Sequence, residues 1–245
     1  MIKNRGPITI FKMEIIKVTD GVVIIKNCLT FEEQKKLGKM VLDFGNLINS
    51  DGVPNFSKTR GRNYSNLDEY GEQTKQYMKS ICERTLKSVQ EVDKTMPNSN
   101  VTHLLSLIYV DKVGMGFHKD DGENDGDFDT PVISFTIGNS CIFEYKITET
   151  EDIIDEFTGI MEFKIHTTTH SSQLDSGDVI VFGGSQRMMY HRVKKVLKGT
   201  GSEQLEIGDN RINLTFRQAT SVIGKEEEFS TEKYRQRINK QYGVF

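Results

Sequence analysis

The chain has 245 residues, of which 27% are charged and 36% hydrophobic, a composition typical of a soluble globular protein. Its formal net charge of −3 means that any binding of nucleic acid would need a local basic patch. Three cysteines without a CxxC pair indicate neither a zinc ribbon nor a disulfide framework. With no signal-peptide pattern and no apolar run that could span a membrane, we expect a cytosolic or nuclear protein with no membrane partner.

The first hundred residues (1–100) are predicted to form a helical extension that includes a loop over the substrate. Residues 22–26 are an apolar run typical of a buried strand. Thr30 and Glu33 make a capping-box pattern, which predicts a helix that ends near residue 45. Residues 46–66 are rich in Gly, Asn and Ser and predict a long loop. Residues 67–96 repeat apolar side chains at three- and four-residue steps, which indicates a second helix.

From residue 103 onward, short segments rich in β-branched and aromatic residues alternate with turn residues. The predicted strands are 103–110, 132–138, 141–147, 160–167, 178–182 and 211–218. Many short strands after two helices predict a mainly β protein with flanking helices (α+β), whose sandwich or jelly-roll core spans residues 101–220. The charged segment 221–245 is expected to be a tail, and the whole chain (1–245) to form a single domain.

His118 and Asp120 are candidate metal ligands, because side chains two residues apart project from the same face of an extended strand. His191, which follows the predicted strand 178–182 and a Gly-Gly turn, is the candidate third ligand. Two histidines and one carboxylate on one face of an iron ion leave positions open for a co-substrate and oxygen. A lone HxD occurs often by chance, and a hydrogen-bonded strand histidine is the alternative interpretation of His191.

The segment 211–217 alternates strictly between polar and apolar residues. One face carries Arg211, Asn213, Thr215 and Arg217, and the other carries Ile212, Leu214 and Phe216. A solvated surface strand is the ordinary interpretation, but this polar face has two arginines and no acid of its own. Arginine forks suit carboxylates, and a pair of them suits a dicarboxylate. Beside a metal with two histidines and a carboxylate, that dicarboxylate would be 2-oxoglutarate.

Together these segments resemble the AlkB family of Fe(II)/2-oxoglutarate dioxygenases. The matching pieces follow the family's order over roughly half of the chain: Tyr109, then His118 and Asp120, then 131–145, 177–193 and 211–218. The resemblance implies a double-stranded β-helix core, in which His118, Asp120 and His191 hold Fe(II) and form the catalytic centre. It also implies that Arg211, helped by Tyr109 and Asn213, binds the distal carboxylate of 2-oxoglutarate, with Arg217 near the keto-acid end.

The resemblance further implies that residues 46–66 form the substrate lid, in which repair members stack an aromatic side chain on an extruded base. Because the chain has no Trp, Phe56 and Tyr64 are the candidates. Departures from the family pattern are Leu107, where an Asn is common, and Gly122, where repair members carry an acidic residue. The candidate substrate-binding residues are therefore Phe56, Tyr64, the phosphate-binding candidates Arg60 and Arg62, and Asp121 and Glu123 on either side of Gly122.

The expected activity is oxidative demethylation of 1-methyladenine or 3-methylcytosine in DNA or RNA. It would use Fe(II), 2-oxoglutarate and O2, and release succinate, CO2 and formaldehyde. A monomer is expected. One alternative is the same chemistry on a protein side chain or a small metabolite, and another is a jelly-roll binding module without catalysis. Lys194, Lys195 and Lys198 are interpreted as a solvated turn, with a nucleic-acid backbone as the alternative partner.

Overall fold

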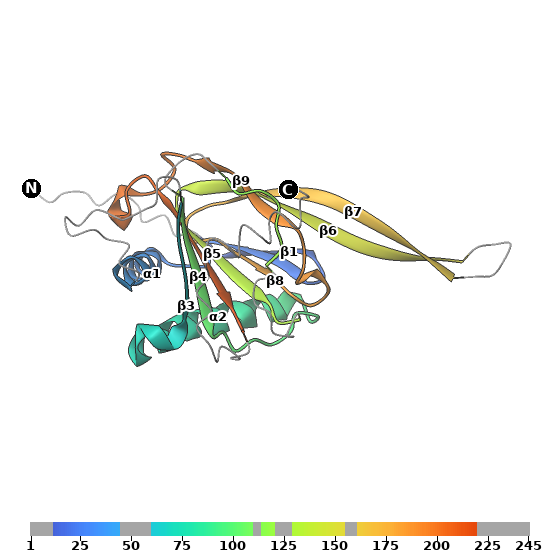
Figure 1. The fold of residues 1–245 in the computed structure, drawn as a ribbon, viewed down its shortest axis with the longest axis horizontal. Coiled ribbons are helices and arrows are strands. Elements are labelled where there is room, and N and C mark those ends of the chain that lie inside the picture. The colour runs from blue at the N-terminus through green and yellow to red at the C-terminus, as the bar shows by residue number, and fades with distance from the viewer. Residues whose placement is uncertain (1–11, 45–59, 110–113, 121–128, 155–160, 220–245) are drawn as a thin grey trace, which may run out of the picture.

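The computed structural model describes residues 12–44, 60–109, 114–120, 129–154 and 161–219, and its strands form two antiparallel sheets (Figure 1). The large sheet has the order β1-β2-β8-β5-β10-β4-β3, and the small sheet has the order β7-β6-β9. The strands are β1 (Glu14–Thr19), β2 (Val22–Lys26), β3 (Arg60–Asn66), β4 (His103–Tyr109), β5 (Val132–Gly138), β6 (Ser140–Ile154), β7 (Met161–Leu174), β8 (Val179–Phe182), β9 (His191–Leu197) and β10 (Arg211–Arg217).

Two helices, α1 (Phe31–Phe44) and α2 (Glu72–Val92), pack on one face of the large sheet. Short 3-10 helices occupy Leu67–Tyr70, Gly184–Gln186 and Glu203–Leu205. Helix residues such as Leu37 and Met78 share a buried apolar cluster with Ile212, Leu214 and Phe216 of β10. None of the described helices is long and apolar enough to span a membrane.

Alternate residues of the same strands point to a second apolar cluster between the two sheets. In β8, Val179 and Val181 join the helix side, whereas Ile180 and Phe182 join the cluster shared with the small sheet. This period-two division fills both sides of the large sheet with side chains. The predicted mainly β fold with a double-stranded β-helix core and flanking helices is confirmed.

The N-terminal residues contribute more strand than the sequence predicted. Strands β1 and β2 pair with each other, and β2 pairs with β8, so they extend the large sheet. The prediction of a loop through residue 66 was wrong for Arg60–Asn66, which form β3 and pair with β4 along its whole length. The polar sequence RGRNYSN has little strand propensity, and its strand exists because the edge of the apolar strand β4 needs hydrogen-bonding partners.

The small sheet is dominated by the long hairpin of β6 and β7, which extends away from the body (Figure 1). Its strands run past the predicted limits, from Cys141 paired with Leu174 to Ile154 paired with Met161. Lys194 and Lys195 lie in β9 and not in a turn, which corrects the sequence interpretation. Residues 46–59 of the predicted lid (46–66) and the whole predicted tail (221–245) lie outside the described residues.

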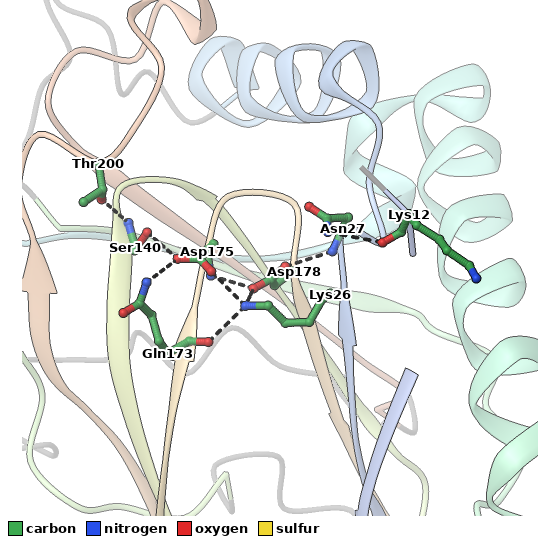
Figure 2. Close-up of polar contacts among 8 residues, drawn as sticks. All are labelled: Lys12, Lys26, Asn27, Ser140, Gln173, Asp175, Asp178 and Thr200. Carbon is green, nitrogen blue, oxygen red and sulfur yellow. Dashed lines mark hydrogen bonds and ion pairs between the residues drawn. The ribbon is translucent and has the colours of Figure 1, made fainter. Parts of the chain in front are cut away.

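A cluster of hydrogen-bonded polar side chains links the end of β2 to the turn before β8 (Figure 2). The ammonium of Lys26 donates to the carboxylate of Asp178 and, at 2.9 Å, to that of Asp175. Asp178, whose side chain is 1% exposed, also accepts from the backbone N–H groups of Asn27 at 2.9 Å and Asp175 at 2.6 Å. Asp178 therefore satisfies three donors from two segments.

We expect Asp178→Ala to lower the free energy of unfolding by about 3 kcal/mol, because buried donors lose their acceptor. Asp175→Ala is the matched control, since it removes a carboxylate that also contacts Lys26 but is 43% exposed. Its expected effect is about 1 kcal/mol or less. Urea denaturation measures both, and equal losses in the two variants would contradict this view of the cluster.

Candidate metal centre

The three predicted metal ligands come together in the structure. One side-chain atom from each of His118, Asp120 and His191 lies within 4.8 Å of the other two. Oδ1 of Asp120 is 3.7 Å from Nε2 of His191 and 3.9 Å from Nε2 of His118. The three groups therefore converge on one point, as a facial site with two histidines and one carboxylate requires.

Backbone pairing brings His118 to His191. The N–H of His118 donates to the carbonyl of His191 at 3.0 Å, and the reverse bond is 2.9 Å. Nearby, Met115 donates to the carbonyl of Val193 at 2.7 Å. The expected strand at His118 is thus an isolated bridge against the start of β9, and the two histidine side chains share one face of it.

Both histidines present Nε2 to the site. Nδ1 of His118 contacts the carbonyl of Gly116 at 2.9 Å, and Nδ1 of His191 contacts that of Met189 at 3.2 Å. A carbonyl only accepts, so each Nδ1 carries the proton and each Nε2 keeps its lone pair for a metal. Burial, the largest influence, lowers the pKa of His191 to about 4, so this imidazole is neutral at physiological pH, as a ligand must be.

Asp120 is held by two arginines. Nη2 of Arg217 lies 2.7 Å from Oδ1 of Asp120, and Nη1 of Arg187 donates to its backbone carbonyl at 2.8 Å. Burial by itself would raise the pKa of Asp120, but Arg217, His191 and His118 outweigh it and lower that pKa to about 2. The third ligand is therefore ionised. Arg187 was not predicted, because it lies in an irregular turn with no periodic pattern around it.

Aromatic side chains hold the ring of His191 in place. The ring of Phe143 is stacked on it at a centroid distance of 5.6 Å, and the ring of Phe182 lies at 5.1 Å. Both phenylalanines belong to the apolar cluster between the sheets. Phe143 therefore contacts a metal ligand directly.

Arg211 lies in β10 and is fully buried, and the hydrogen bonds that its guanidinium donates both come from Nη2. Its Nη2 donates to Thr136 Oγ1 at 3.0 Å and to Asn213 Oδ1 at 2.9 Å, and its guanidinium lies 5.1 Å from the ring of Tyr109. Its Nε and Nη1 have no hydrogen-bond acceptor, and it has no ion pair with a carboxylate, among the described residues. The nearby Cys141 thiol supplies no charge, because burial raises its pKa.

A buried guanidinium with two unused donors requires an anionic acceptor that supplies parallel lone pairs. A carboxylate of 2-oxoglutarate has this chemistry, so the residues present fit the predicted co-substrate. Ser134, Thr136 and Thr215 extend the polar row between Arg211 and the metal end of β10. In the sequence, the polar residues Ser134 and Thr136 alternate with the apolar residues Ile133 and Phe135. This alternation could have predicted the polar row. Leu107, in the place of the family's Asn, is buried in the apolar cluster.

Of the predicted substrate-binding residues, the structure describes the side chain of Tyr64 alone. Its ring is 37% exposed and stacks on the imidazole of His103 at 5.3 Å, so one of its faces is already occupied. Arg60 and Arg62 lie in β3, but their side chains are not among the described ones. Phe56, Asp121 and Glu123 lie outside the described residues, and their roles stay predictions.

The approach of residues 114–118 to β9 depends on Gly114. A Cβ at this position would lie 2.0 Å from the carbonyl oxygen of Val193 and 2.7 Å from that of Lys194, both of which are backbone atoms. We expect Gly114→Ala to displace His118 and to weaken Co(II) binding at least about 10-fold, as displaced ligand geometry does in other sites. Gly116→Ala is the control, since its Cβ would meet nothing within 4 Å. Similar Co(II) affinities in the two variants would contradict this prediction.

A double-stranded β-helix that holds two histidines and a carboxylate beside a buried arginine defines the class of non-haem iron oxygenases that use a 2-oxo acid. Residues 21–217 match the model of the 2OG-Fe(II) oxygenase superfamily, and the chain belongs to this superfamily. The predicted Fe(II), 2-oxoglutarate and O2 are the cofactor and co-substrates of the family.

Within this superfamily, the chain is similar to AlkB-type proteins. It is 32% identical over 136 residues to the "DNA N(6)-methyladenine demethylase ALKBH1C" of Arabidopsis thaliana. This match covers 54% of this chain and 26% of that protein. It is 33% identical over 129 residues to an AlkB homologue of Caulobacter vibrioides, covering 53% and 48%. The matches thus span half or less of these relatives' own length. The fold matches the structure of OsALKBH1 with a TM-score of 0.60 at 22% identity, over 83% of this chain and 100% of that one.

Proposed function

We propose that the protein demethylates N-methylated bases of DNA or RNA by oxidation. The observation that carries the oxygenase chemistry is the buried guanidinium of Arg211, whose Nε and Nη1 have no acceptor among the described residues. It lies on the same strand as Arg217, which contacts the metal ligand Asp120. AlkB-type relatives, among them one named a DNA N(6)-methyladenine demethylase, support the nucleobase substrate.

In this proposal the chain supplies geometry and electrostatics. His118, Asp120 and His191 would hold Fe(II), and Arg211 would bind a carboxylate of 2-oxoglutarate. When bound, Fe(II) and 2-oxoglutarate would use O2 to supply one oxygen atom to a C–H bond of the methyl group, while the other oxygen would enter succinate and CO2 would be released. The N-hydroxymethyl product then loses formaldehyde and leaves the free base. Phe143 and Phe182 keep His191 fixed and water away from its ring.

The test is a panel of oligonucleotides that carry 1-methyladenine, 3-methylcytosine or N6-methyladenine. We expect loss of the methyl group by mass spectrometry, with one succinate formed for each methyl group removed, and loss of both products in His118→Ala. The panel separates the two adenine positions, of which the N6 position is favoured by the relative's name and position 1 by the sequence resemblance. Succinate formation without demethylation of any oligonucleotide would overturn the nucleobase substrate but not the oxygenase.

A further inference from the structure

The outer face of the small sheet carries basic and aromatic side chains beside the metal centre. Residues next to the two histidine ligands alternate to the opposite face of the bridge from them. We call this set the cationic face, and it consists of Phe117, Lys119, Lys146, Tyr190, Arg192 and Lys194. Phe117 and Lys119 flank His118, and Tyr190 and Arg192 flank His191.

Aromatic rings position three of these cations. The guanidinium of Arg192 lies 4.4 Å from the ring centroid of Phe117, and the ammonium of Lys146 lies 4.7 Å from the same centroid. The ammonium of Lys119 lies 4.6 Å from the ring centroid of Tyr190, which is 44% exposed. A ring attracts a cation without neutralising its charge, so the N–H donors keep their capacity to bind an anion.

Among the described residues of this face, Glu144 is the acid that contacts the cations. Glu144 accepts from Arg192 and Lys194 at 2.7 Å each. Lys119 and Lys146 form no ion pair with any carboxylate that the structure describes. On the helix side, by contrast, Lys35 contacts Glu206 at 2.7 Å, and Lys75 contacts Asp68 and Glu72. Among the described side chains of this face, four cations accompany one carboxylate, which makes a local basic patch on a chain whose net charge is −3.

We propose that the cationic face binds the phosphodiester backbone of the nucleic-acid substrate next to the target nucleotide. This inference rests on the proposed function and deepens it. Phosphates suit ammonium donors that are held in place and have no described carboxylate partner, as in Lys119 and Lys146, and contacts to phosphates orient a strand without reading its sequence. His118, whose side chain is 32% exposed, lies between Phe117 and Lys119 in the sequence, so the cationic face is built on the same segment that carries two of the metal ligands.

The test compares two double variants of the full chain by fluorescence anisotropy with a single-stranded oligonucleotide. Lys119→Ala/Lys146→Ala removes the two ring-held ammonium groups, and Lys35→Ala/Lys75→Ala removes the same charge from the helix side. We expect the first variant to bind about 10-fold more weakly, and its slope of log Kd against log salt to fall by about 1.4, because each lost phosphate contact in a single strand contributes about 0.7. The control variant is expected to keep the wild-type slope.

A second variant tests the role of the ring. Phe117→Leu removes no charge but leaves Arg192 and Lys146 without their aromatic support, and we expect a weaker affinity with an unchanged salt slope. For every variant, the ratio of kcat/KM for a methylated oligonucleotide to that for the same methylated nucleoside is measured. We expect this ratio to fall in Lys119→Ala/Lys146→Ala.

The outcomes separate the two proposals. If wild type binds and demethylates the oligonucleotide, but Lys119→Ala/Lys146→Ala keeps its affinity and its salt slope, the cationic face is not the backbone site. Equal losses in the control double variant would also overturn the inference, because they would reflect overall charge. If wild type itself neither binds nor demethylates any oligonucleotide, the proposed nucleic-acid substrate fails first.

Discussion

Arg211→Met is expected to impair use of 2-oxoglutarate while making the metal-free fold more stable. The KM for 2-oxoglutarate should rise about 30-fold or more, because losing one partner of a buried charged pair costs about 2–5 kcal/mol. The free energy of unfolding of the metal-free protein should rise by about 1 kcal/mol, because the variant removes a buried charge that no described carboxylate compensates. The two effects have opposite signs, which an ordinary structural arginine would not give.

Two measurements check this prediction. Urea denaturation gives the stability of the metal-free protein, and a thermal shift with 2-oxoglutarate and Mn(II) reports co-substrate binding. Arg84→Met is the matched control, since Arg84 is exposed and contacts Glu33 at 2.6 Å. It should keep the thermal shift in full. A loss of several kcal/mol in metal-free Arg211→Met would mean that the guanidinium is already compensated without 2-oxoglutarate.

The polar face of β10 shows why this part of the site could be predicted. Strict alternation over 211–217 requires Arg211 and Arg217 to share a face with Asn213, and pairing with β4 and β5 on both sides fixes that face toward the small sheet. Likewise, the spacing of His118 and Asp120 was enough to place both side chains on one side, although the segment is a bridge and not a regular strand. Local periodicity therefore predicted the shared face of the two arginines and of two ligands, whereas His191 was assigned through the family resemblance.

Other features had no local signal. β3 is polar and is a strand only because β4 offers it an edge, so its formation depends on a contact distant in sequence. Arg187 contacts the backbone carbonyl of Asp120 from an irregular turn that lies 67 residues further along the chain. Cation–π contacts such as that of Lys146 with Phe117 join segments that no short sequence window contains.

Asp120→Asn is expected to damage both metal binding and the fold, because the carboxylate is at once a ligand and the partner of Arg217. Affinity for Co(II) should fall at least about 100-fold, since an anionic ligand is lost where even supporting contacts are worth about 10–100-fold. The metal-free protein should lose about 3 kcal/mol of stability, as when one partner of a buried ion pair is removed. His118→Ala should lose Co(II) binding but little stability, because that side chain is 32% exposed and has no arginine partner among the described residues.

The double variant Asp120→Asn/Arg217→Met separates the two roles of the carboxylate. Removing both charges leaves no uncompensated guanidinium beside the asparagine, so most of the lost stability should return while Co(II) affinity stays low. The four proteins to compare are wild type, Asp120→Asn, Arg217→Met and the double variant. Co(II) absorption titration measures their metal affinity, and urea denaturation measures their stability. If stability fails to recover, the Asp120–Arg217 contact at 2.7 Å is not what the single variant loses. If Co(II) affinity recovers with it, Asp120 supports the fold and is not a metal ligand.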